Sequence, residues 1–185
     1  AKTLFPYTTL FRSGKKHWFW TWQTPKATFI THSDNRGSAT IESAFPKGFP
    51  YSTLVHDGWK AQLKTNSLQH QTCIAHIQRH LNYLEQLYPD NKWVGKFKKM
   101  LYDSILVKEK YIFESDKYEE QKTVVWEQLD ELLNNPPDKT QKELYTFYKR
   151  MCKEKMHLFT FLSIKEVPPD NNASERAIRN IKVKQ

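Results

Sequence analysis

The spacing of hydrophobic positions divides this chain into a β-rich first part and a helical second part. Aromatic and β-branched residues fill two short segments around Thr24-Pro25-Lys26, a pattern typical of an antiparallel hairpin. An apolar run further on ends at Asp57-Gly58, and we expect Gly58 to allow an abrupt exit from the sheet. The predicted strands are 18–23, 27–32, 52–56 and 69–74, with a short helix at 39–45. Asp57 is thus expected at the carboxyl end of a strand, where α/β folds commonly place binding groups.

From residue 74 onward the apolar residues recur at helical spacing. The first helix is predicted to continue through Leu87, where Pro89-Asp90-Asn91 ends it. Three further helices are predicted over 94–113, 117–133 and 141–162. This pattern indicates a helical insertion between the sheet and one last helix.

The last helix begins after Pro168-Pro169, which stop whatever precedes them. The polar residues 170–172 can accept hydrogen bonds from the free amides of a new helix, so we expect it to begin near Asn172. If Asn172 is the N-cap, Glu175 occupies the capping-box position. An ion pair with Arg179, one turn further on, is a second structural interpretation. From spacing alone, Glu175 can have either of these structural roles or a role in a functional site.

Three blocks of sequence, in order, resemble one known family. They are the segment 167–180, with its Asn-Asn and Glu-Arg pairs; the segment 54–59 followed by 73–79; and the segment 14–20 followed by 24–27 and Arg36-Gly37. Together they resemble the insertion-sequence 66 family of bacterial transposases over roughly residues 14 to 185. The resemblance implies that Asp57 and Glu175 are the second and third acids of an Asp-Asp-Glu catalytic site.

The resemblance also implies a fold and a chemistry. The fold is α/β, a ribonuclease-H-like (retroviral-integrase-like) mixed sheet with helices, built from residues 14–91, a helical insertion 92–163 and the terminal helix region 164–185. In that fold Asp57 and Glu175 would meet to hold Mg²⁺ or Mn²⁺, and two such ions can activate a nucleophile and stabilise the leaving oxygen of a DNA phosphodiester. We therefore expect strand cleavage and transfer of an insertion sequence, a homo-oligomer in the full-length protein, and the bacterial cytoplasm as location.

One segment departs from the family pattern. The family places its first catalytic aspartate on the strand before Gly14, but residues 3–13 contain no acid and resemble the translation of a sequencing adapter. We therefore treat residues 1–13 as an artefactual segment and expect the chain to be truncated at both ends. The alternative is an unusual native strand with Pro6 at its middle. Without the first acid we expect weak metal binding and little or no cleavage. The competing hypothesis is a catalytically dead, basic nucleic-acid-binding module on the same fold.

The charge balance favours a polyanionic partner. Lys and Arg number 29 against 20 Asp and Glu, a net charge of +9, which is typical of nucleic-acid binding. We predict that DNA, both transposon ends and target, contacts His76, Arg79, Arg176, Arg179 and Lys182. Lys96, Lys98 and Lys99 are instead expected on solvated helix faces. No apolar run approaches the roughly 20 residues that cross a bilayer, so no membrane association is expected.

Other candidate ligands are assigned structural roles. Cys73-x-x-His76 has half of a zinc-site spacing, with Cys152 and His157 as further ligands, but Cys73 lies in an apolar strand and we predict no zinc site there. Two cysteines fit a reducing compartment. Asp34 begins an Asp-Asn-Arg-Gly sequence, which is typical of a turn, so it is not expected to replace the missing aspartate. His56 should point to the opposite face from Asp57.

Overall fold

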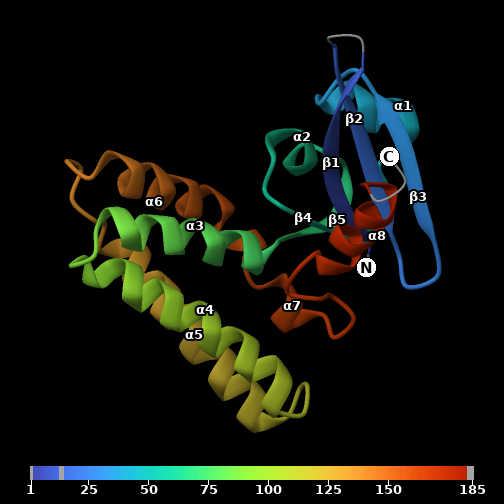
Figure 1. Cartoon of the computed structure of the whole chain (residues 1–185). Coiled ribbons are helices and arrows are strands. Elements are labelled where there is room, and N and C mark those ends of the chain that lie inside the picture. The colour runs from blue at the N-terminus through green and yellow to red at the C-terminus, as the bar shows by residue number, and fades with distance from the viewer. Residues whose placement is uncertain (1, 13–14, 183–185) are drawn as a thin grey trace. The chain divides into compact units, whose positions relative to one another are not determined.

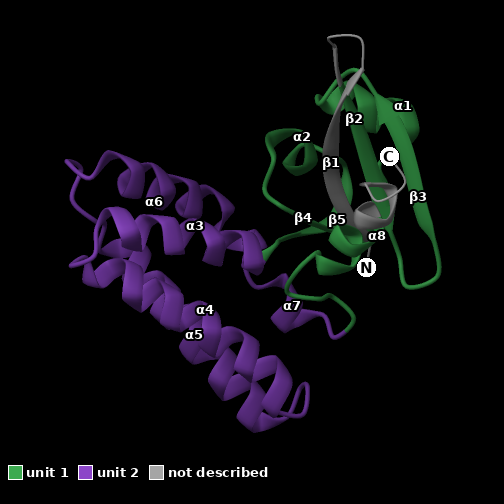
Figure 2. Ribbon diagram, viewed as in Figure 1, with its two compact units in different colours: residues 1–73, 166–185 green, residues 74–165 purple. Residues whose placement is uncertain are grey.

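The computed structural model describes the backbone of residues 2–12 and 15–182 and the side chains of residues 17–177. Figure 1 shows a mixed α/β chain that contains one sheet and several helices. Residues 1–73 and 166–185 form one compact unit, and residues 74–165 form a second, all-helical unit (Figure 2). We describe each unit by itself.

The first unit is built on a five-stranded mixed sheet with the strand order β3-β2-β1-β4-β5. β2 pairs antiparallel with both β1 and β3, whereas β4 pairs in parallel with both β1 and β5. The strands are β1 (Lys2–Arg12), β2 (Lys15–Gln23), β3 (Thr28–Ser33), β4 (Phe49–His56) and β5 (Ser67–Thr72). The predicted hairpin is therefore confirmed as β2 and β3, and the predicted strand before Asp57 is confirmed as β4.

Aromatic side chains form the core on one side of this sheet. Trp20 and Trp22 of β2 stack with their ring centroids 5.9 Å apart and pack with Phe49 and Leu54 of β4 in one buried cluster. Ile41, from the short helix α1 (Ser38–Ala44), completes that cluster. Such aromatic pairs add stability beyond the area they bury. Because successive side chains of a strand point to opposite faces, Trp20 and Trp22 share the inward face of β2.

Two parts of the sheet differ from, or go beyond, the sequence prediction. β5 ends at Thr72, because the apolar residues from Ile74 onward lie on the buried stripe of a helix rather than on a strand. The segment 3–11, whose place was open, lies within β1 between β2 and β4. Its pairing with β2 shifts register between Pro6 and Thr9, as expected for a proline, which has no amide hydrogen to donate.

The second unit contains the long helices and their own core. Its elements are α3 (Ile74–Leu87), α4 (Lys92–Lys110), α5 (Asp116–Asn134), α6 (Lys142–Glu154), the 3₁₀ turn η1 (Lys155–His157) and α7 (Thr160–Ser163). Asn91 and Ser115 cap α4 and α5, since each side chain accepts a hydrogen bond from the amide two or three residues on. The predicted helices over 94–113 and 117–133 are confirmed with shifted ends.

The predicted single helix over 141–162 is wrong, because the chain breaks after Glu154. Residues 158–162 are all buried, and five consecutive buried positions surround a helix on every side instead of forming one stripe. The chain therefore turns through η1 and α7. Carbonyls around α7 find partners on other helices: Tyr118 Oη donates to Leu162 O at 3.0 Å.

The compact units divide the chain elsewhere than the predicted domains do. The helical unit begins at residue 74 rather than 92 because α3 packs against α4. It ends at residue 165, close to the predicted 163. α8 (Asn172–Lys182) belongs to the first unit and contacts β1 and β2. None of the helices in the described part of the chain combines the length and apolarity needed to span a membrane.

Candidate functional site

Asp57 is the first residue after β4 and is half-buried. Gly58 follows with φ +83°, a left-handed conformation that favours glycine, so the expected abrupt exit from the sheet is confirmed. The turn carries its own hydrogen bond, since Trp59 N donates to Asp57 Oδ1 at 3.1 Å. One carboxylate oxygen is therefore held by the backbone two residues on.

Positive charge lies beside Asp57 on Arg36, from the turn after β3. The Arg36 guanidinium carbon lies 3.8 Å from the centroid of the Trp59 ring and 5.2 Å from that of Trp18, an arrangement typical of cation–π contacts. Partial burial lowers the pKa of Arg36 from its ordinary value, and the negative charge of Asp57 opposes that shift. Trp59 Nε1 also donates to Arg36 O at 3.3 Å.

Arg36 and Trp59 were not among the residues predicted for the site. The signals available in the sequence were Arg36-Gly37 in a turn and an aromatic residue directly after Asp57-Gly58. Both segments contributed to the resemblance, but nothing in their spacing says that the guanidinium stacks on the indole. Trp59 keeps 40% of its surface exposed. The stacked pair is therefore accessible to a partner.

His56 fixes the backbone next to Asp57 from inside the sheet. Its side chain is fully buried, and its Nδ1 accepts a hydrogen bond from Gly58 N at 3.0 Å. Its Nε2 must then carry the proton and donates to His70 Nδ1 at 3.0 Å. His70 Nε2 in turn lies 3.0 Å from Ser67 Oγ. This chain of neutral histidines ties the Asp57 turn to β5.

Glu175 lies in the first turn of α8 and is half-buried. Asn171 O accepts hydrogen bonds from the amides of Ser174 and Glu175, at 3.0 and 3.3 Å. Asn171 is therefore the N-cap, and Glu175 is the fourth helical residue rather than the third. The predicted helix start is confirmed, but the capping-box interpretation, which required Asn172 as N-cap, is wrong.

Asn171 carries an unusual side chain for a buried position. It is fully buried, and neither its Oδ1 nor its Nδ2 has a hydrogen-bond partner among the residues that the structure describes. An unsatisfied buried polar group costs about 1–3 kcal/mol. A neighbouring acid, Asp170, instead accepts from Asn172 N at 3.0 Å and from Asn172 Nδ2 at 2.7 Å. The start of α8 thus retains hydrogen-bonding capacity beside Glu175.

Both candidate acids belong to the first unit. β4, which leads into Asp57, pairs in parallel with β1, and α8, which carries Glu175, contacts β1 and β2. The strand and the helix that hold the acids therefore contact a common strand, although they are separated by more than a hundred residues of sequence.

The predicted DNA-binding residues lie in both units. Arg176 is exposed on α8, while Arg179 and Lys182 lie further along that helix with side chains outside the described residues. His76 and Arg79 lie on α3, in the helical unit. Arg79 Nη2 lies 3.3 Å from His76 Nε2, so these two side chains share one helix face. Their direction relative to the acids stays a prediction.

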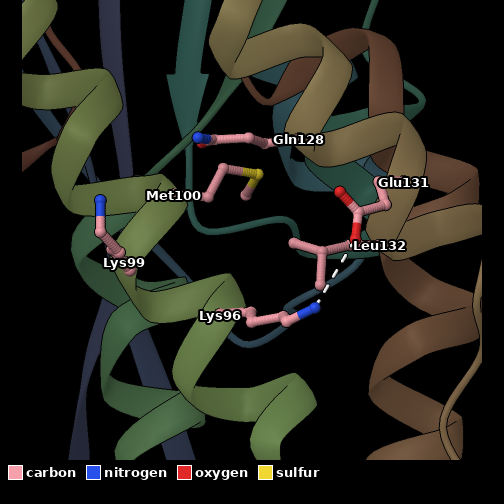
Figure 3. Close-up of a pocket in the computed structure, with 6 residues that line it drawn as sticks. All are labelled: Lys96, Lys99, Met100, Gln128, Glu131 and Leu132. Atoms are coloured by element: carbon pink, nitrogen blue, oxygen red, sulfur yellow. Dashed lines mark ion pairs between the residues drawn. The ribbon is translucent and has the colours of Figure 1, made fainter.

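The lysines of α4 have acidic partners. Lys98 Nζ lies 2.6 Å from Glu85 Oε2, and Lys99 Nζ lies 2.5 Å from Asp103 Oδ2. Figure 3 shows Lys96 directed toward Glu131, 3.6 Å away, at a pocket of about 200 Å³ between α4 and α5. The three lysines therefore lie at the helix surface, as expected, and each also has an acidic partner.

Neither Cys73 nor Cys152 forms a disulfide in the part of the chain that the structure describes. Cys73 is fully buried, and its amide donates to His56 O at 2.7 Å, whereas Cys152 is exposed on α6. Burial of Cys73 agrees with its expected place in the core.

Comparison with known proteins identifies the family. The sequence model described as "Transposase IS66 family" matches residues 7–185. No curated protein and no solved structure gives a significant match. The match spans nearly the whole chain, including the segments that carry Asp57 and Glu175. The chain therefore belongs to the IS66 family of transposases.

Proposed function

We propose that this chain is the catalytic core of a DNA transposase, built on a ribonuclease-H-like fold, with Asp57 and Glu175 as metal ligands. The observation that carries the proposal is the turn after β4, where a half-buried carboxylate at the carboxyl end of a parallel strand lies beside a stacked arginine. Open α/β sheets commonly bind ligands at this edge. The helical unit between β5 and α8 supports the proposal, because the resemblance implies a helical insertion before the terminal helix.

The donor set fits a hard divalent cation. Asp57 and Glu175 offer carboxylate oxygens, and Mg²⁺ commonly binds through one or two carboxylates, its remaining ligands being water and substrate phosphate. Bound there, Mg²⁺ or Mn²⁺ would supply an activated nucleophile and stabilise the charge of the leaving oxygen. The segment 3–13 contributes no acid, so we propose that the affinity for metal is weak and the cleavage rate low.

The remaining residues position the acids and the DNA. The Trp59 amide holds one oxygen of Asp57, and the His56–His70 chain holds the backbone of the same turn. Arg36 and Arg176 can each present a planar fork of N–H donors to phosphate oxygens. Exposed Trp59 offers a ring face on which a base can stack. DNA, as transposon end and as target, is the proposed partner.

The test is metal-dependent cleavage of labelled DNA that carries the terminal repeats of the element. The chain, its Asp57→Asn and Glu175→Gln variants, and a version with residues 1–13 replaced by the corresponding family segment are compared in Mg²⁺ and Mn²⁺. Glu166→Gln is the matched control, since Glu166 is exposed in the same unit.

We expect the replaced version to cleave, and either acid substitution in that background to abolish cleavage while Glu166→Gln does not. If all versions bind DNA and none cleaves in either metal, the proposal fails and the chain is a basic binding module on this fold.

A further inference from the structure

The register of the β2–β3 hairpin brings together His17, His32 and Asp34, three residues whose side chains can bind a metal ion. Trp18 pairs with Ser33 and Phe19 with His32. One step beyond the Trp18–Ser33 pair, His17 faces Asp34 across the hairpin. Residues two apart on a strand share a face, so His32 and Asp34 point the same way. His17 is their cross-strand neighbour on that face.

One ligand atom from each of the three side chains lies close to the other two. Asp34 Oδ1 lies 2.6 Å from His17 Nδ1, His32 Nε2 lies 3.0 Å from His17 Nδ1, and His32 Nε2 lies 4.0 Å from Asp34 Oδ1. Ligand atoms around a tetrahedral cation with bonds of about 2.0–2.1 Å are about 3.3–3.4 Å apart. The observed triangle matches that spacing after shifts of well under an ångström for each atom.

Hydrogen bonds alone do not satisfy all three atoms of this triangle at once. Neutral histidine carries one ring hydrogen, and His17 Nδ1 faces both a carboxylate oxygen and the second imidazole nitrogen. A single hydrogen on Nδ1 would have to be shared between the two. A cation at the centre would accept lone pairs from all three atoms at once. The imidazole rings are already stacked, with centroids 4.9 Å apart.

We propose that His17, His32 and Asp34 bind a divalent transition-metal cation of the Zn²⁺ class. Imidazole nitrogen suits Zn²⁺, Co²⁺ and Ni²⁺, whereas Mg²⁺ prefers a shell of oxygens. His17 is 21% exposed, His32 51% and Asp34 79%, so water can complete the coordination. The site is separate from the acids Asp57 and Glu175 and takes a different class of metal.

The loop that carries Asp34 is already ordered by hydrogen bonds, which lowers the entropic cost of binding. Asn35 N donates to Ser33 Oγ at 3.0 Å, and Trp20 Nε1 and Thr40 Oγ1 both donate to Asn35 O, at 3.3 and 2.9 Å. Arg36 follows two residues after Asp34. A cation held by Asp34 would therefore fix the turn that places Arg36 on Trp59 beside Asp57.

The experiment titrates the chain with Zn²⁺ by calorimetry and with Co²⁺ by visible absorption. Variants His17→Gln, His32→Gln and Asp34→Asn are compared with the controls His80→Gln and Asp90→Asn, which lie in the helical unit or its turns. Circular dichroism checks folding. Asp34→Asn is the safest variant, because that side chain is largely exposed.

We expect one Zn²⁺ per chain, a Co²⁺ spectrum without a thiolate charge-transfer band, and no displacement by millimolar Mg²⁺. Loss of an outer-shell partner alone commonly costs 10- to 100-fold in metal affinity, so each ligand substitution should weaken binding at least about tenfold. The controls should bind as the unmodified chain does. The proposal is overturned if the folded chain binds no Zn²⁺, if Asp34→Asn and His32→Gln bind unchanged, or if the spectrum reports cysteine ligation.

Discussion

The position of Asp57 depends on a residue that cannot touch a substrate. His56 is fully buried, and its two ring nitrogens are both engaged, one with the Gly58 amide and the other with His70. These contacts determine the tautomer of His56, with its ring hydrogen on Nε2. The neighbouring histidine thus acts as a positioning residue for the carboxylate beside it.

The His56–His70 chain should be measurable as stability. We expect His56→Ala to lower the free energy of unfolding by about 2–4 kcal/mol, because it leaves a cavity and deprives the Gly58 amide and His70 Nδ1 of their partner. Gln69→Ala is the control on the adjoining strand β5; its side chain is exposed, so the cost should stay within about 0.5 kcal/mol. Urea unfolding followed by circular dichroism measures both. A cost for His56→Ala as small as that of the control would show that the chain of histidines does not hold this turn.

Among the secondary-structure elements, β1 occupies the central place of the sheet and yet carries no acid. Its parallel pairing sets Lys2 opposite Leu54 and Thr3 opposite Val55. Continued by two residues, that register puts position 5 level with Asp57. A carboxylate introduced there would lie on the strand next to β4, where the resemblance to the family implies the first aspartate.

We therefore expect Phe5→Asp to strengthen Mn²⁺ binding and to give Mn²⁺-dependent cleavage of element-end DNA. A third carboxylate raises the negative charge and the number of oxygen ligands at the site. Phe11→Asp is the matched control, because position 11 pairs with Lys16 at the other end of the same strand. Isothermal titration and the cleavage assay read the two effects. Equal metal affinity in both variants, with the fold intact, would contradict the assignment of Asp57 to the metal site.

For the whole molecule, local pattern predicted most of the elements in order, although neither β1 nor the break after Glu154, and it predicted the positions of both acids within them. Asp57 follows a strand and Glu175 lies in the first turn of a helix, as their flanking glycine and prolines indicate. Non-local features were not predictable in this way. The cross-strand register that joins His17 to Asp34, the stacking of Arg36 on Trp59, and the packing of α3 with the helical unit all depend on contacts between distant segments.

The net charge of +9 leads to a prediction about the chain as a whole. Each phosphate contact contributes about 0.9 to the slope of log affinity against log salt for duplex DNA, because bound counterions are released. Arg176 is exposed beside Glu175, so Arg176→Gln should reduce that slope by about one and weaken binding to every duplex alike. Lys98→Gln removes the same charge from a side chain already paired with Glu85, and its slope should stay unchanged. Fluorescence anisotropy over a salt series measures both. Equal slopes for the two variants would mean that the face of α8 bearing Arg176 does not contact the phosphate backbone, and that the helical unit or the sheet supplies the DNA-binding surface.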